Sequence, residues 1–74
     1  MSKHFSAFYV SWREAKNRPV GLFANETTFG RAAAEAVEAK LNDLAEDGWI
    51  IDRVIPAGGL TPQQTSAFTI IAFK

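Results

Sequence analysis

The sequence contains no cysteine and a single histidine among its 74 residues. Without cysteine there is no disulfide, no thiol nucleophile and no thiolate ligand for a metal ion. The lone histidine, His4, has no second histidine with which to bind a transition metal, and no sequence pattern places an acid or a nucleophile beside it for catalysis. We therefore expect no catalytic residue, no metal and no cofactor, and a binding protein is favoured over an enzyme.

An excess of one charge is also missing, as is any long apolar run. Eight basic and eight acidic side chains give a formal net charge of zero, which argues against nucleic acids and membrane surfaces as general partners. No run approaches the ~20 apolar residues that cross a bilayer. The first residues, MSKHFSAF, lack the apolar core of a signal peptide. These observations predict a cytoplasmic protein.

What the chain does have is hydrophobic residues, which make up 47% of a length that suits one domain, residues 1–74. A domain this small buries only about 60% of the surface that its unfolded chain exposes. Without disulfides or a metal, so short a chain is often stabilised by association. We therefore expect a homo-oligomer, a dimer or larger.

The longest patterned segment, Thr27 to Gly48, predicts one amphipathic helix. Apolar residues recur at intervals of three and four, and charged residues fall on the opposite side. The apolar stripe consists of Phe29, Ala33, Val37, Leu41 and Leu44, with Gly30, Ala34 and Ala45 beside it. Asn25, Thr27 and Thr28 offer cap oxygens, of which Thr27 or Thr28 is expected to cap the first turn, and Gly48 is expected to end the helix in a left-handed conformation. Gly30 is either a weak point or a position of close packing. Trp49 is expected to be buried against the last leucines of the stripe.

Three further segments have the composition of strands. They run from His4 to Trp12, from Trp49 to Ile55 and from Ala67 to Phe73. A fourth, Pro19 to Ala24, would return as a hairpin, with proline tolerated at its start. Ala57 to Ser66, which contains two consecutive glycines and a Thr-Pro step, is expected to be a loop.

This order of segments predicts an α+β fold, in which a three- or four-stranded antiparallel sheet carries one helix on one face. Alternation places apolar residues on both faces of every strand. In the first strand Phe5, Ala7 and Tyr9 oppose Phe8, Val10 and Trp12; in the second Trp49, Ile51 and Ile55 oppose Ile50 and Val54; in the last Phe68, Ile70 and Ala72 oppose Ala67, Thr69, Ile71 and Phe73. One helix covers only one face, so the other face is expected to bind a second copy of the chain.

The end of the helix and the strands after it carry a recognisable pattern. The residues concerned are Leu41, Asn42, Leu44, Ala45, Gly48, Trp49, Val54, Phe73 and Lys74. In these positions the chain resembles the small bacterial domains of the family called domain of unknown function 4177, over roughly its C-terminal half and more loosely at Phe5 to Trp12. The resemblance implies the fold described above and a bacterial source. It implies no activity, because that family has no assigned function. Arg13 to Asn25 has no counterpart in the pattern, and Trp49-Ile50-Ile51 is more apolar than is usual for it.

The candidate ligand or partner contacts are Tyr9, Trp12, Arg13, Arg18, Trp49 and Phe68. Arg13 and Arg18 lie in a basic turn beside Trp12, which is how single nucleic-acid strands are held by stacking, although a solvated turn is the simpler interpretation. The acidic side chains near the helix end oppose the helix dipole. They form a solvated face, a contact for a basic partner or, although their spacing matches no calcium loop, a site for a cation. They are Asp43, Glu46, Asp47 and Asp52.

Three functions remain open from the sequence, of which the third, a nucleic-acid accessory protein that uses the Arg13–Arg18 turn, is disfavoured by the net charge of zero. The favoured one is a non-enzymatic binding or protein-interaction module that self-associates through its sheet, with an unidentified protein as a further partner. The alternative is a small-ligand-binding protein or minor enzyme, with an apolar pocket between sheet and helix or at the dimer seam. That pocket would be lined by Tyr9, Trp12, Trp49 and Phe68.

Overall fold

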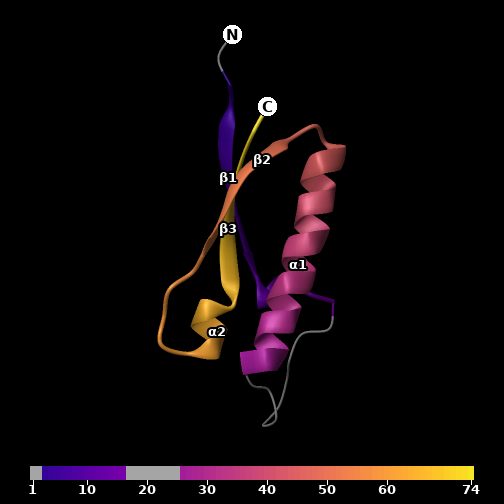
Figure 1. Cartoon of the computed structure of the whole chain (residues 1–74). Helices are drawn as coiled ribbons and strands as arrows, with labels where there is room; N and C mark the ends of the chain where they lie inside the picture. Colours follow the sequence, from indigo (N-terminus) through magenta and orange to yellow (C-terminus); the bar gives the residue numbers. More distant parts are fainter. Residues whose placement is uncertain (1–2, 17–25) are drawn as a thin grey trace.

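The computed structural model describes residues 3–16 and 26–74. The elements in chain order are β1 (Phe5–Ser11), the 3-10 turn η1 (Trp12–Glu14), α1 (Glu26–Glu46), β2 (Ile50–Pro56), the short α2 (Pro62–Thr65) and β3 (Ala67–Phe73) (Figure 1). The three strands form one antiparallel sheet in the order β1-β3-β2, so the last strand of the chain lies in the centre. Helix α1 covers one face of this sheet. The fold is α+β, as the sequence predicted. The fourth strand proposed for Pro19 to Ala24 falls outside the described residues.

Helix α1 ends as the sequence predicts but begins earlier. Gly48 has φ +88°, and the amides of Gly48 and Trp49 donate to the carbonyls of Ala45 and Leu44 at 3.1 and 2.9 Å. This pair of bonds is the Schellman arrangement, which requires the left-handed conformation that glycine adopts without strain. The predicted cap at Thr27 or Thr28 is wrong, because the helix already includes Glu26.

The buried stripe of α1 is rotated slightly from the predicted one. Phe29, Ala33 and Leu44 are buried as expected, but Ala32 and Ala36 complete the stripe. The flanking positions assigned from the sequence, Gly30, Ala34 and Ala45, are exposed instead. Ala32, Ala33 and Ala36 are small, so this side of the helix can approach the sheet closely.

Strand β2 contains an irregularity that changes which residues share a face. Its register against β3 shifts between Ile51 and Arg53, with Asp52 as the extra residue of a β-bulge. Ile51 and Val54 therefore face α1, whereas Ile50 and Ile55 face the other way. The prediction that Ile51 and Ile55 share a face is wrong, because an extra residue reverses the alternation beyond it.

The ends of the predicted loop and of the first strand also differ from expectation. The loop after β2 contains α2, where Thr61 caps the turn by accepting from the Gln64 amide at 3.2 Å. Pro62 occupies the first helical position, where no amide is needed. Strand β1 ends at Ser11 rather than at Trp12, because Ser11 caps the following η1.

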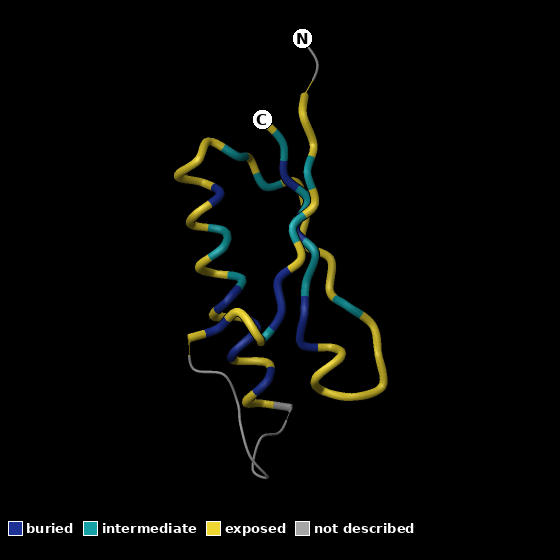
Figure 2. Tube along the Cα trace, turned by 180° about the vertical axis from the view of Figure 1, so that it is seen from behind, coloured by how far each residue is buried: buried dark blue, intermediate teal, exposed yellow. Residues whose placement is uncertain are grey.

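Burial is uneven along the molecule. Buried residues gather where the first half of α1 meets the end of β1 and the start of β3 (Figure 2). They include Val10, Ala32, Ala36, Ala67 and Ile70, of which Ile70 is completely buried. Towards the other end the residues packed on this core, such as Phe8 and Trp49, are only half-buried. The core is therefore small and lies towards one end of the sheet.

Candidate interaction surface

The face of the sheet opposite α1, called here the open face, is defined by the strand register. Its residues are Phe5, Ala7 and Tyr9 of β1, Thr69, Ile71 and Phe73 of β3, and Ile50, Arg53 and Ile55 of β2. The large apolar side chains at its margins are highly exposed: Phe5 by 58%, Tyr9 by 65%, Ile50 by 57% and Ile55 by 46%. At the end of the central strand β3, the Phe73 ring lies 5.3 Å from that of Phe5. Among the described residues, no helix or strand covers this face.

The size of this surface is close to that of a functional contact. Side chains of this kind, at these exposures, present on the order of 500 Å² of mostly apolar surface. The largest apolar patch on a typical monomer is about 300–600 Å² and often marks a binding site. The open face is thus the most substantial apolar surface in the described part of the chain, and it includes one predicted contact residue, Tyr9.

The predicted contacts Trp12 and Arg13 lie together at the start of η1. Their side chains contact each other and other residues of the same chain. The indole of Trp12 packs edge-on against Phe29 at 4.8 Å and donates through Nε1 to the Gln63 carbonyl at 3.1 Å. The Arg13 guanidinium lies 4.6 Å from the centre of the same indole. Trp12 therefore closes the end of the core, and Arg13 covers part of the ring that a nucleic-acid base would need. Arg18 lies outside the described residues.

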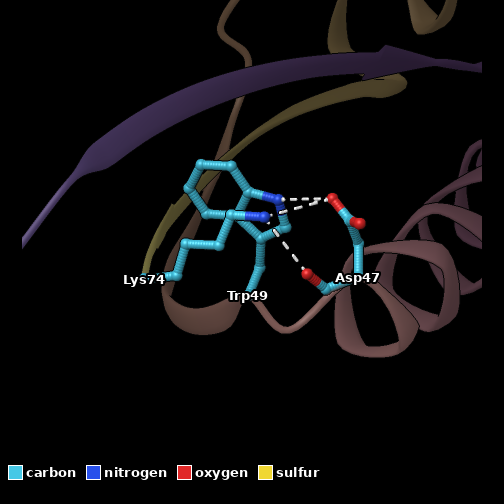
Figure 3. A network of polar contacts seen from close by, with 3 residues as sticks. All are labelled: Asp47, Trp49 and Lys74. Carbon is cyan, nitrogen blue, oxygen red and sulfur yellow. Dashed lines mark hydrogen bonds and ion pairs between the residues drawn. The ribbon is translucent and has the colours of Figure 1, made fainter.

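The predicted contact Trp49 lies at the opposite end of α1 and is half-buried, less than expected. Its ring packs edge-on against Phe8 at 5.4 Å. Its Nε1 donates to Asp47 Oδ2 at 3.2 Å, while Lys74 Nζ lies 4.7 Å from the ring centre and 3.3 Å from the same oxygen (Figure 3). Of the acidic group at the helix end, Asp47 thus pairs with a lysine of its own chain. This pairing offsets the unfavourable placement of Asp47 near the helix C-terminus.

The last predicted contact, Phe68, pairs in register with Val10 and is half-buried. Trp12 and Trp49 lie beyond opposite ends of α1, while Tyr9 lies on the open face. The four aromatic residues that were expected to line one pocket therefore do not come together in one site.

A groove of about 200 Å³ does occur, between α1 and the outer edge of β1. Its lining residues are Tyr9, Val10, Glu14, Ala36, Ala39, Lys40 and Asp43. Of the predicted contacts, only Tyr9 is among them. The groove is smaller than the ~300–1,000 Å³ of typical small-molecule sites.

The carboxylate in this groove is held by the end of β1. Glu14 Oε2 accepts from the Ser11 amide and, at 2.9 Å, from the Ser11 hydroxyl, while Ser11 Oγ accepts from the Arg13 amide at 3.2 Å. Partial burial alone would raise the pKa of Glu14, but the bonds from Ser11, the backbone amide of Glu14 and the charge of Arg13 outweigh it and lower the pKa below its ordinary value. The carboxylate therefore stays charged at neutral pH. The spacing Ser-x-x-Glu is that of a capping box, and this signal, which sequence reasoning missed, would have predicted the contact.

Comparison with protein-family models, with curated proteins and with solved structures finds no match to this chain. The resemblance to the family of unknown function 4177 therefore stays a prediction. Among the described residues, no helix is sufficiently long and apolar to cross a membrane.

Proposed function

We propose that the protein is a non-enzymatic interaction module that self-associates by packing the open face of its sheet against that of a second copy. The observation that carries the proposal is the exposure of Phe5, Tyr9, Ile50 and Ile55 on one face, opposite the helix. Burial of apolar surface is the main favourable contribution to association. The protein would act in the cytoplasm, as expected from its composition.

The apolar area of the open face supports a second copy of the chain as the partner that covers it. Two open faces packed together would bury about 1,000 Å² in total, which meets the ~1,000 Å² expected of a specific interface. A twofold arrangement is favoured because the same patch serves both partners. Arg53 on this face has its Nε paired with Asp52 Oδ2 at 2.9 Å, and Lys3 Nζ lies 4.6 Å from the centre of the Phe73 ring at one end of the face. Arg53 would therefore enter the seam as an ion pair, while Lys3 precedes β1 and lies at the exposed end of the face.

The alternative of a small-ligand-binding protein receives less support. Its predicted lining residues do not converge, and the groove beside β1 is small. An interaction module requires only a surface, and the open face supplies one.

The test is the mass in solution. We expect light scattering to give an oligomer for the wild type at low micromolar concentration, and a smaller mass for the double variant Ile50→Glu, Ile55→Glu. Each new carboxylate would have to lose its hydration at the seam, which is strongly unfavourable.

A matched control is Leu60→Glu. Leu60 is 99% exposed but lies in the loop before α2, away from the sheet. This variant should keep the wild-type mass. A wild-type protein that remains monomeric on concentration would refute the proposal, as would a double variant with an unchanged mass.

A further inference from the structure

The two edges of the sheet are built differently. The outer edge of β2 is interrupted by the bulge at Asp52, carries the Asp52–Arg53 ion pair and ends at Pro56. A bulge, charges and proline are the devices by which proteins prevent an edge strand from pairing with another chain. The outer edge of β2 is thus protected against pairing.

The outer edge of β1 has none of these devices. Its seven residues, FSAFYVS, include no charge and no proline, and its register against β3 is regular from Phe5 to Ser11. Among the described residues, only β3 pairs with β1. A strand of this composition with a free edge is a template for a further strand.

The backbone hydrogen bonds show which groups point outward from β1. The amide and carbonyl of His4 both bond to Lys74, at 2.9 and 3.0 Å, and the Trp12 amide donates to the Ser66 carbonyl at 3.1 Å. In an antiparallel pair, residues that bond to the partner alternate with residues that do not. The amides and carbonyls of Phe5, Ala7 and Tyr9 therefore point away from β3.

At Ser11 the outward amide is already occupied by Glu14. The available part of the edge thus runs from Phe5 to Tyr9, and Ala7 is its midpoint.

We propose that β1 pairs antiparallel with β1 of a second copy, around a twofold axis at Ala7. This register brings Ala7 opposite the partner's Ala7, and Phe5 opposite the partner's Tyr9. Within the available part of the edge, it is the register that uses all the outward groups of both strands, because each of the three residues faces an outward residue of the partner. The two sheets become one continuous sheet of six strands.

The side chains fit this register. A small residue lies on the axis, and an aromatic residue faces an aromatic residue on either side of it, which is a favourable cross-strand pair. Continued towards the N-terminus, the register places the partner's His4 opposite Val10 and the partner's Lys3 opposite Ser11. There the groove presents the carboxylates of Glu14 and Asp43 and the ammonium of Lys40. Lys3 of one copy thus approaches a groove of the other that carries two acidic side chains and one basic side chain.

This contact goes beyond the proposed seam, since it uses the edge of the sheet rather than its open face. If both contacts form, the assembly contains four copies: edge pairing yields a six-stranded sheet, and two such sheets pack through their open faces. The two contacts can be tested separately.

Cross-linking tests the edge alone. The double variant Ile50→Glu, Ile55→Glu removes the open-face seam, and the chain contains no cysteine of its own. In this background we expect Ala7→Cys to form a disulfide-linked dimer under mild oxidation, because residues paired across an antiparallel ladder lie within the ~4.4–6.8 Å between Cα atoms that a disulfide requires.

The control for random collision is Leu60→Cys in the same background, at a more exposed position. Cross-linking at position 7 no greater than at position 60 would overturn the proposal.

A second variant tests the backbone bonds. Ala7→Pro removes an outward amide that β3 does not use, and with it both bonds across the axis. We expect self-association through the edge to weaken about tenfold or more, while Ala7→Val, which keeps the amide, should not weaken it. Circular dichroism checks that both variants fold. If a folded Ala7→Pro variant associates as strongly as Ala7→Val, edge pairing through Ala7 is wrong. If the open-face seam does not form, Ala7→Pro and Ala7→Val can still be compared, because both carry their change at the same position of the edge strand β1.

Discussion

Lys74 Nζ lies 4.7 Å from the centre of the Trp49 indole, directly over the ring that seals the end of α1 against the sheet (Figure 3). The same ammonium lies 3.2 Å from the Asp47 carbonyl. One side chain from the end of β3 thus joins the helix terminus to the residue that precedes β2. Both Lys74 and Asp47 are substantially exposed, at 44% and 70%, so the ion pair itself contributes less than ~1 kcal/mol. The same ammonium and carboxylate also contact the indole, through its ring face and its Nε1.

Trp49→Ala should destabilise the protein by about 3 kcal/mol, the lower end of the ~3–5 kcal/mol expected for a large aromatic residue in a core, because this indole is only half-buried. The variant loses the edge contact with Phe8 and leaves Lys74 without its ring. Urea denaturation followed by circular dichroism measures the change. Trp49→Phe keeps an aromatic ring and should recover more than half of the loss. A loss below ~1 kcal/mol for Trp49→Ala would show that this corner contributes little to folding.

Two glycines should respond to alanine in opposite directions. Gly30 lies in α1, and an added Cβ there meets no atom within 4 Å. Gly30→Ala should therefore stabilise the protein by about 0.5–1 kcal/mol through helix propensity. Gly48→Ala should destabilise it by roughly 1–2 kcal/mol, although there is equal space, because φ is +88°. Thermal denaturation of the two variants tests this. If both changed the midpoint in the same direction, the conformation at the end of α1 would be misassigned.

Glu14 should make stability depend on pH in acid. Its pKa is lowered in the folded state from the ordinary value of 4.5, so its stabilising effect is present above that value and is lost as the pH falls through the lower, folded pKa. Glu14→Gln should cost about 0.5 kcal/mol at pH 7, a small figure because the side chain is exposed. As the pH falls below 4.5, the difference between the two proteins should disappear.

Urea midpoints at pH 7 and pH 3 provide this comparison. Glu38→Gln, on the exposed side of α1, controls for the loss of one negative charge. A difference between wild type and Glu14→Gln that persists unchanged at pH 3 would mean that the capping carboxylate is not the source of the effect.

The elements that depend on local interactions could be predicted from the sequence. The helical spacing of apolar residues in α1 and the glycine that ends it act within a few residues of chain, and both are present as expected. The alternation in β1 and β3 is likewise a local property, because successive side chains of any strand point to opposite faces. The sequence by itself therefore determined the α+β class, the last strand and the apolar character of both sheet faces.

The tertiary structure decided what depends on partners distant in the chain. The bulge at Asp52 is defined by how β2 pairs with β3. No local sequence signal therefore indicated that Ile55 would lie on the face opposite to Ile51. The Lys74–Trp49 contact joins residues whose strands meet only after folding. The aromatic residues expected to line one pocket lie apart, because Trp12 packs against the first turn of α1 and Trp49 follows its last turn. The strand order likewise left β1 on an edge, where its outward amides face no other strand in the described residues. Pairing between strands is non-local, and this is the physical reason that neither the edge nor the groove beside it could be read from spacing alone.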